Sequence, residues 1–108
     1  MQELGFFAYI IECADSTLYS GWTLDPARRL DTHNAGKGSK YTRSRLPVKF
    51  AAVWQFPDKI EAMRFEARLK RLSRAKKRLL ILEASDDEHR QRCVPTSSIR
   101  STTQLTRS

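Results

Sequence analysis

The sequence has 108 residues, the length of one domain with a single modest hydrophobic core. Its formal net charge is +8, and the segment from Arg28 to Arg78 holds 16 Lys and Arg against 4 Asp and Glu. This excess favours a polyanionic partner such as nucleic acid, with a solubilising surface as the alternative. The sequence has no basic segment followed by an apolar run, so it predicts no signal peptide. No apolar stretch is long enough to span a membrane.

The cysteine pattern predicts free thiols. Cys13 falls in a predicted core strand and Cys93 in a polar C-terminal segment, and they form no CxxC pair. We therefore expect a reducing, cytoplasmic setting, and neither a disulfide nor a zinc site.

The first part of the chain predicts a hairpin followed by a helix. Two strand-like runs, 6–13 and 17–23, flank Ala14-Asp15-Ser16, and Asp25-Pro26 then gives an N-cap carboxylate before a proline at the first helical position. The helix should cover residues 26–35, with Gly36 as its stop.

The length of the hairpin loop decides which way Tyr9 and Tyr19 point, because side chains alternate between the two faces of a strand. A three-residue loop at 14–16, with Ser16 in the left-handed conformation, places both tyrosines on one face. A two-residue turn would place them on opposite faces.

The remaining elements follow from caps and spacing. Residues 36–45 are predicted to form a loop with a short helical turn near Tyr41. Residues 48–56 are predicted to form a third strand. Asp58, with Glu61 three residues on, opens a helix whose apolar side carries Ala62, Phe65, Leu69 and Leu72. Ser73 caps a last helix over 74–84.

We therefore predict an α+β fold, in which a small, three-stranded, mainly antiparallel sheet is flanked by helices in the order β-β-α-β-α-α. Residues 1–84 form the domain, and residues 85–108 form a polar, mobile tail because they hold few apolar side chains.

A set of residues in a fixed order carries a family resemblance: Tyr9, Tyr19-Ser20-Gly21, Arg29, His33 and Glu66. The chain resembles the GIY-YIG nuclease superfamily, and most closely its small single-domain bacterial members, from about Phe6 to about Ile81. Phe7-Ala8 stand where the first half-motif has Gly-Ile, but its tyrosine is kept. The predicted order of elements agrees with the fold that this resemblance implies.

The resemblance implies a cytoplasmic endonuclease that uses one Mg²⁺ or Mn²⁺ ion to hydrolyse DNA phosphodiester bonds, as in DNA repair. No DNA-reading domain is added, so cleavage should be structure-selective or of low specificity. One alternative is a catalytically weak nucleic-acid-binding accessory module, and a weaker one is a basic accessory protein that binds RNA.

The matched residues have candidate catalytic roles. Glu66 would be the metal ligand, or else a simple partner of Lys70 at i,i+4. Arg29 would hold the scissile phosphate in a bidentate fork, or else be a surface arginine. His33, one turn further on, would orient or transfer a proton, or else be structural.

Tyr9 and Tyr19 are the candidate proton acceptors, and the sequence does not separate the base from the residue that positions water or phosphate. A phenol needs a nearby cation or metal for this task, because its pKa is near 10. Both could instead be strand aromatics with exposed hydroxyls. Gly21 would allow a close backbone approach beside the site.

Nucleic acid would contact cations near the site and the cationic loop, in which an aromatic side chain suits base stacking. The predicted contact residues are Arg28, Arg29, Lys37, Lys40, Tyr41, Arg43 and Lys70. A flexible solvated connection is the alternative for this loop.

Overall fold

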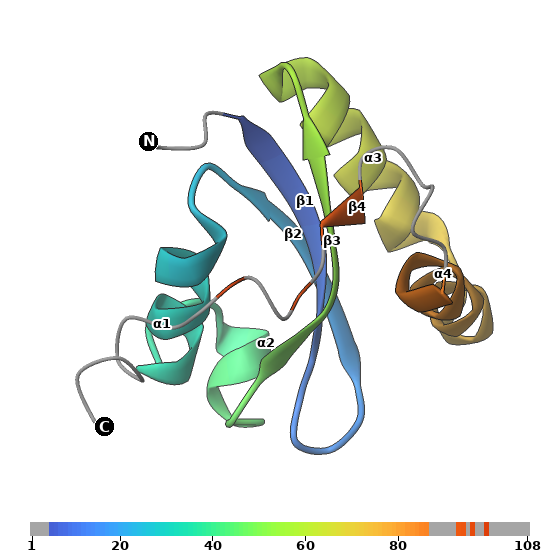
Figure 1. The fold of residues 1–108 in the computed structure, drawn as a ribbon. Coiled ribbons are helices and arrows are strands. Elements are labelled where there is room, and N and C mark those ends of the chain that lie inside the picture. The colour runs from blue at the N-terminus through green and yellow to red at the C-terminus, as the bar shows by residue number, and fades with distance from the viewer. Residues whose placement is uncertain (1–4, 87–92, 95, 97–98, 100–108) are drawn as a thin grey trace.

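The computed structural model describes residues 5–86, 93–94, 96 and 99, and shows an antiparallel sheet with helices on both faces (Figure 1). The elements are β1 (Phe6–Glu12), β2 (Leu18–Thr23), α1 (Pro26–Asn34), α2 (Lys40–Arg43), β3 (Lys49–Phe56), α3 (Lys59–Arg71), α4 (Arg74–Asp86) and β4 (Cys93–Val94). The strand order is β2-β1-β3-β4, so β1 lies between β2 and β3. Helices α1 and α2 lie on one side of the sheet, and α3 and α4 on the other.

The α+β fold is confirmed, but the prediction of three strands is wrong, because the described residues form four. Strand β4 pairs with β3 through Val94 opposite Val53 and Cys93 opposite Trp54. Two residues within a polar segment show no periodicity, so the sequence did not indicate this strand. Most of residues 85–108 lie outside the described residues, and the proposed division after residue 84 and the mobility of the tail stay predictions.

The hairpin loop has the predicted length. The backbone N–H of Cys13 donates to the carbonyl of Thr17 at 2.9 Å, which closes a loop of Ala14, Asp15 and Ser16. Ser16 has a φ of 71°, the left-handed conformation expected at the last position of such a loop. The predicted loop and its consequence for the tyrosines are therefore confirmed.

The predicted caps also form. The Asp25 carboxylate accepts from Arg28 N at the start of α1, and Asp58 accepts from Glu61 N at the start of α3. The hydroxyl of Ser73 accepts from Lys76 N in the first turn of α4. The short helical turn near Tyr41 is α2. None of the described helices combines the length and apolar character needed to cross a bilayer.

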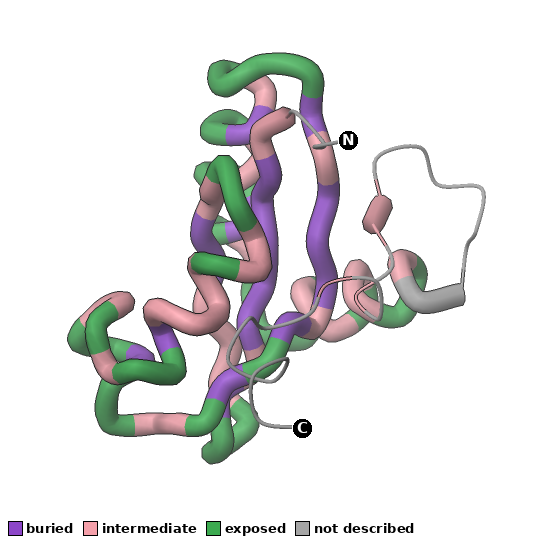
Figure 2. The backbone as a smooth tube through the Cα atoms, turned by 60° about the vertical axis from the view of Figure 1, so that its left-hand side comes forward, coloured by how far each residue is buried: buried purple, intermediate pink, exposed green. Residues whose placement is uncertain are grey.

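Each face of the sheet has its own buried cluster, and the buried segments run mainly along the strands (Figure 2). A register shift in β3 opposite Ile10 and Ile11 lets Phe50 and Val53 face the same side as Tyr9. On the side of α1, the buried cluster comprises Phe7, Tyr9, Ile11, Cys13, Val48, Phe50 and Val53. On the side of α3 and α4, it comprises Ala8, Ile10, Ala52, Trp54, Phe56, Ala62 and Leu69.

Candidate active site

Tyr9 and Tyr19 share the face of the sheet that carries α1, as the loop length predicts. Both rings lie edge-on to His33, with ring centroids 6.3 Å from it for Tyr9 and 5.6 Å for Tyr19. Gly21 lies opposite Tyr9 in the neighbouring strand, and a Cβ atom added there would lie 2.5 Å from the Tyr9 hydroxyl. The hydroxyl therefore occupies space that only a glycine leaves open, which supports the predicted close approach.

Helix α1 brings Arg29 and His33 to the hydroxyl of Tyr9. Arg29 Nε donates to Tyr9 Oη at 3.4 Å, and Tyr9 Oη lies 3.4 Å from His33 Nε2. The two side chains come from positions four residues apart and share a face of α1. The phenol oxygen therefore lies between a permanent cation and an imidazole ring.

Sequence reasoning missed the contact on the other side of the imidazole. His33 Nδ1 lies 2.9 Å from Thr42 Oγ1, and both residues are fully buried. Ser39 is the N-cap of α2, and a serine three residues before Thr42 is a cap signal that the sequence contains. Nothing in the sequence, however, indicated that this helical turn contacts His33.

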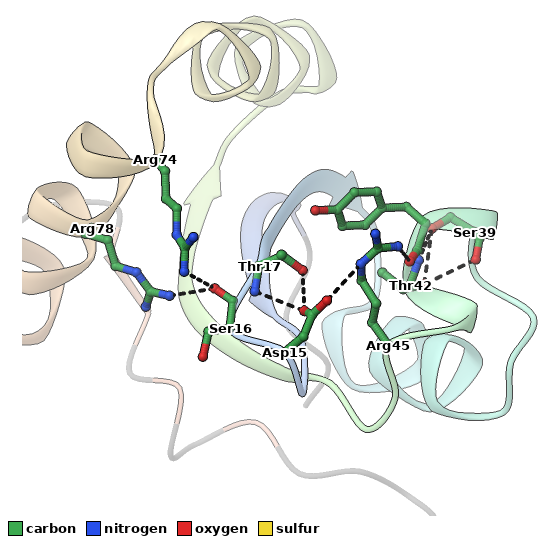
Figure 3. A network of polar contacts seen from close by, with 9 residues as sticks. Asp15, Ser16, Thr17, Ser39, Thr42, Arg45, Arg74 and Arg78 are labelled. Atoms are coloured by element: carbon green, nitrogen blue, oxygen red, sulfur yellow. Dashed lines mark hydrogen bonds and ion pairs between the residues drawn. The ribbon is translucent and has the colours of Figure 1, made fainter.

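Tyr41 packs against other side chains of the site. Its ring stacks on that of Tyr19 with centroids 5.8 Å apart, and the Arg45 guanidinium lies 4.1 Å from the Tyr41 centroid. Arg45 also forms an ion pair with Asp15 in the hairpin loop, at 3.1 Å (Figure 3). The hairpin loop is therefore joined to the tyrosine stack.

Two arginines of α4 hold the other side of the same loop. Arg74 and Arg78 both donate to the carbonyl oxygen of Ser16, at 3.0 Å and 2.7 Å (Figure 3). Arg78 also contacts the Glu12 carboxylate at 3.3 Å. These bonds brace the loop that sets the register of the two tyrosines.

Burial keeps the central pair of groups neutral. Burial, together with the smaller effect of the positive charge of Arg29, lowers the pKa of His33 to about 4. Burial also raises the pKa of Tyr9, against the hydrogen bond and charge of Arg29, which lower it. At neutral pH the site therefore holds a phenol and a neutral imidazole beside a guanidinium cation.

Glu66 lies on α3, on the other side of the sheet from α1, and it forms an ion pair with Lys70 rather than with the other predicted site residues. Lys70 Nζ is 3.1 Å from Glu66 Oε2, with the glutamate side chain only 18% exposed. The negative charge of Glu66 nevertheless contributes to the raised pKa of Tyr9, which indicates electrostatic coupling between the two. The alternative i,i+4 pair with Lys70 is therefore present, and the role of Glu66 as a metal ligand stays a prediction.

The donor set can be tested against a divalent ion. Among the described residues, no group of three or more His, Cys, Asp or Glu side chains converges on one point. One half-buried carboxylate suits only a divalent ion that keeps several waters and takes phosphate oxygens of a substrate as further ligands. It does not fit an ion caged by protein ligands alone.

The predicted nucleic-acid contacts lie in separate parts of the surface. Arg28 on α1 and Lys70 on α3 are exposed, and Lys37, Lys40 and Arg43 are exposed in the loop and in α2. Tyr41 is 39% exposed, although its ring is stacked within the protein. Part of its surface is therefore engaged before any nucleic acid binds.

Comparison with known proteins gives a consistent match. The family profile of the "GIY-YIG catalytic domain" matches residues 5–79. The "UPF0213 protein BH0048" of Halalkalibacterium halodurans is 49% identical over 78 residues, which cover 72% of this chain and 83% of that protein. The "UPF0213 protein VNG_2274C" of Halobacterium salinarum is 54% identical over 72 residues, covering 67% and 94%.

A solved structure shares the fold. The solution NMR structure of the protein EF2693 from E. faecalis superposes with a TM-score of 0.52 at 33% sequence identity, covering 83% of this chain and 96% of that chain. The similarity thus extends from sequence to the arrangement of strands and helices.

Proposed function

Because the chain belongs to the GIY-YIG family, we propose that it is a divalent-metal-dependent endonuclease that hydrolyses DNA phosphodiester bonds. The observation that carries the proposal is the Tyr9 hydroxyl, bonded to Arg29 on one side and lying 3.4 Å from His33 on the other. A phenol placed between a guanidinium and a neutral imidazole can accept one proton while it gives another to the imidazole, so its oxygen never carries an unpaired charge.

The side chains suggest how the proton moves. Tyr9 is protonated in the free protein, so it gives its own proton to His33 Nε2 as it accepts one from the attacking water. The water oxygen bonds to phosphorus as the bond to the leaving oxygen breaks, and solvent protonates that oxygen. Bound phosphate offsets the charge of Arg29, which is one cause of the low pKa of His33, and so eases this transfer.

Arg29 stabilises negative charge at two places. Its guanidinium has donors to spare beyond the bond to Tyr9, and these can bind phosphate oxygens as charge builds up in the transition state. Glu66 would hold one Mg²⁺ or Mn²⁺ ion, which supplies charge neutralisation at the phosphate when bound. Tyr19, whose ring faces His33, would border the phosphate.

The substrate follows from charge. The exposed cations Arg28, Lys37, Lys40 and Arg43 would bind the phosphate backbone without reading bases, so cleavage would be selective for structure or of low specificity. DNA is the proposed partner, as in repair, and RNA is the alternative.

One observation favours a second candidate, a nucleic-acid-binding module that cleaves weakly. Glu66 is paired with Lys70, and no acidic or histidine cluster joins it within the described part of the chain. Metal held by one paired carboxylate would bind only weakly without substrate.

The test compares purified wild-type protein with Glu66→Gln, which keeps the shape and removes the charge. Wild type should nick branched, single-stranded or duplex DNA only with Mg²⁺ or Mn²⁺, and Glu66→Gln should lose this activity while DNA binding in chelator stays near wild type. Equal cleavage by both proteins would refute the role of Glu66, and no cleavage by wild type on any substrate would favour the binding module.

A further inference from the structure

The hydroxyl of Thr42 occupies a position that calls for an explanation. Thr42 belongs to α2, a single helical turn, and is fully buried against His33 of α1. Its Oγ1 lies within hydrogen-bond distance of three atoms: His33 Nδ1 at 2.9 Å, Ser39 Oγ at 3.1 Å and the Ser39 carbonyl oxygen at 3.3 Å. A hydroxyl has one hydrogen to donate, so these contacts restrict one another.

The carbonyl decides the direction of the bonds. A carbonyl oxygen can only accept, so the contact between Thr42 and the Ser39 carbonyl requires the hydrogen of Thr42 to point there. The Ser39 hydroxyl oxygen meanwhile accepts from the backbone N–H of Thr42 at 3.2 Å. The remaining lone pair of Thr42 Oγ1 then accepts from His33, which places the imidazole hydrogen on Nδ1.

The other hydrogen bonds of the site are compatible with this donor and acceptor assignment. With hydrogen on Nδ1, His33 Nε2 has a free lone pair that accepts from the Tyr9 hydroxyl, and Tyr9 oxygen in turn accepts from Arg29 Nε. In the opposite tautomer, Arg29 and His33 would both donate to Tyr9, and the Tyr9 hydroxyl makes no other side-chain hydrogen bond among the described residues that could accept its own hydrogen. An unsatisfied buried hydroxyl is costly, so the first arrangement is favoured.

We propose that Thr42 is a positioning residue, which holds His33 as the Nδ1–H tautomer and so keeps the Nε2 lone pair directed at Tyr9. Its catalytic consequence rests on the proposed nuclease function, because only this tautomer lets His33 accept the proton that Tyr9 releases. The assignment of the tautomer does not depend on any activity.

Gly38 and Ser39 also help to fix the His33 ring in place. A Cβ atom at Gly38 would overlap the His33 imidazole, so the backbone there closes directly against the ring. Ser39 caps α2 and binds Thr42 through both its hydroxyl and its carbonyl. The segment therefore holds the ring both by close backbone contact and by a directed hydrogen bond to Nδ1.

The tautomer can be read directly by long-range ¹H–¹⁵N NMR of the imidazole rings at pH 7, with the second histidine assigned through His89→Gln. Wild type should show His33 as Nδ1–H. Thr42→Val, which keeps the shape and removes the hydroxyl, should lose this preference, whereas Thr42→Ser should keep it. The matched control is Thr32→Val, which removes a hydroxyl that donates to the Arg28 carbonyl on the same helix.

The kinetic arm separates this inference from the proposed function. Under single-turnover conditions, Thr42→Val should cleave about 10-fold to 100-fold more slowly with nearly unchanged DNA affinity, and Thr42→Ser should restore most of the rate. A wild-type Nε2–H tautomer, or a tautomer unchanged in folded Thr42→Val, would overturn the inference. Absence of cleavage in wild type would refute the nuclease function alone, and the NMR result would still decide the role of Thr42.

Discussion

The two faces of the central strand β1 have opposite characters. On the face covered by α1 and α2, the buried set includes a tyrosine, a histidine and a threonine joined by polar contacts. On the face covered by α3 and α4, the buried cluster is apolar, and Ser20, opposite Ile10 in β2, is the one buried polar residue beside it among the described residues. Alternation along one strand thus separates the buried contacts of Tyr9, His33 and Thr42 from the apolar cluster, because neighbouring residues of β1 point to opposite faces.

The difference indicates how a small domain can keep polar groups buried. Each polar group on the site face has a partner: Tyr9 has Arg29 and His33, and His33 has Thr42. Buried polar groups are tolerated when they are bonded in this way. The apolar face supplies the hydrophobic stabilisation that this arrangement does not, through residues such as Trp54 and Leu69.

The largest expected effect is the loss of Arg29 from the site face. Arg29→Ala should slow single-turnover DNA cleavage by about 100-fold to 1,000-fold, because a donor to the developing phosphate charge is removed. DNA binding should weaken far less, since one phosphate contact among several is lost. A loss of binding as large as the loss of rate would show that Arg29 acts only in affinity.

The hairpin and helix part of this site could be predicted from sequence. The loop of three residues fixed the parity that puts Tyr9 and Tyr19 on one face, and the four-residue spacing of Arg29 and His33 put both on one side of a helix. These are local rules of backbone geometry, so short stretches of sequence suffice.

The contacts between distant segments could not be predicted. Thr42 meets His33 across a loop that contains Gly36 and Gly38, whose path no local rule determines. Likewise, β4 is too short to carry a periodic signal, and it is stabilised by pairing with β3. Tertiary packing decides both, beyond the reach of local propensity.

A smaller effect is expected in the pH dependence of stability, because His33 is buried in its neutral form. Its pKa is about 4 in the folded protein against 6.5 for an ordinary histidine, so between these values the unfolded state binds more protons than the folded state. Stability should therefore fall as pH drops from about 6.5 to about 4, by on the order of 3 kcal/mol at most. Urea unfolding of wild type and His33→Gln across this range checks the difference. Parallel curves would mean that His33 is not buried in the neutral form.

The smallest expected effect per residue lies in the cationic loop. Replacing Lys37, Lys40 and Arg43 with alanine should reduce the log–log salt slope of duplex DNA binding by about 0.9 for each lost phosphate contact. The control replaces Arg64, Arg71 and Lys76, which are exposed on α3 and α4 and carry the same charge. If both triple variants change the slope equally, binding reflects net charge and not the loop beside the site.

The central claim is that adjacent residues of β1 have different roles, with Tyr9 acting in cleavage and Ile10 in stability. One measurement tests this claim directly. Tyr9→Phe and Ile10→Val each remove a small part of a fully buried side chain, from opposite faces of the strand. In metal-dependent DNA nicking, Tyr9→Phe should lose about 100-fold or more in rate while remaining folded. Ile10→Val should lose about 1 kcal/mol of stability and keep the wild-type rate. Wild-type cleavage by folded Tyr9→Phe would contradict the account.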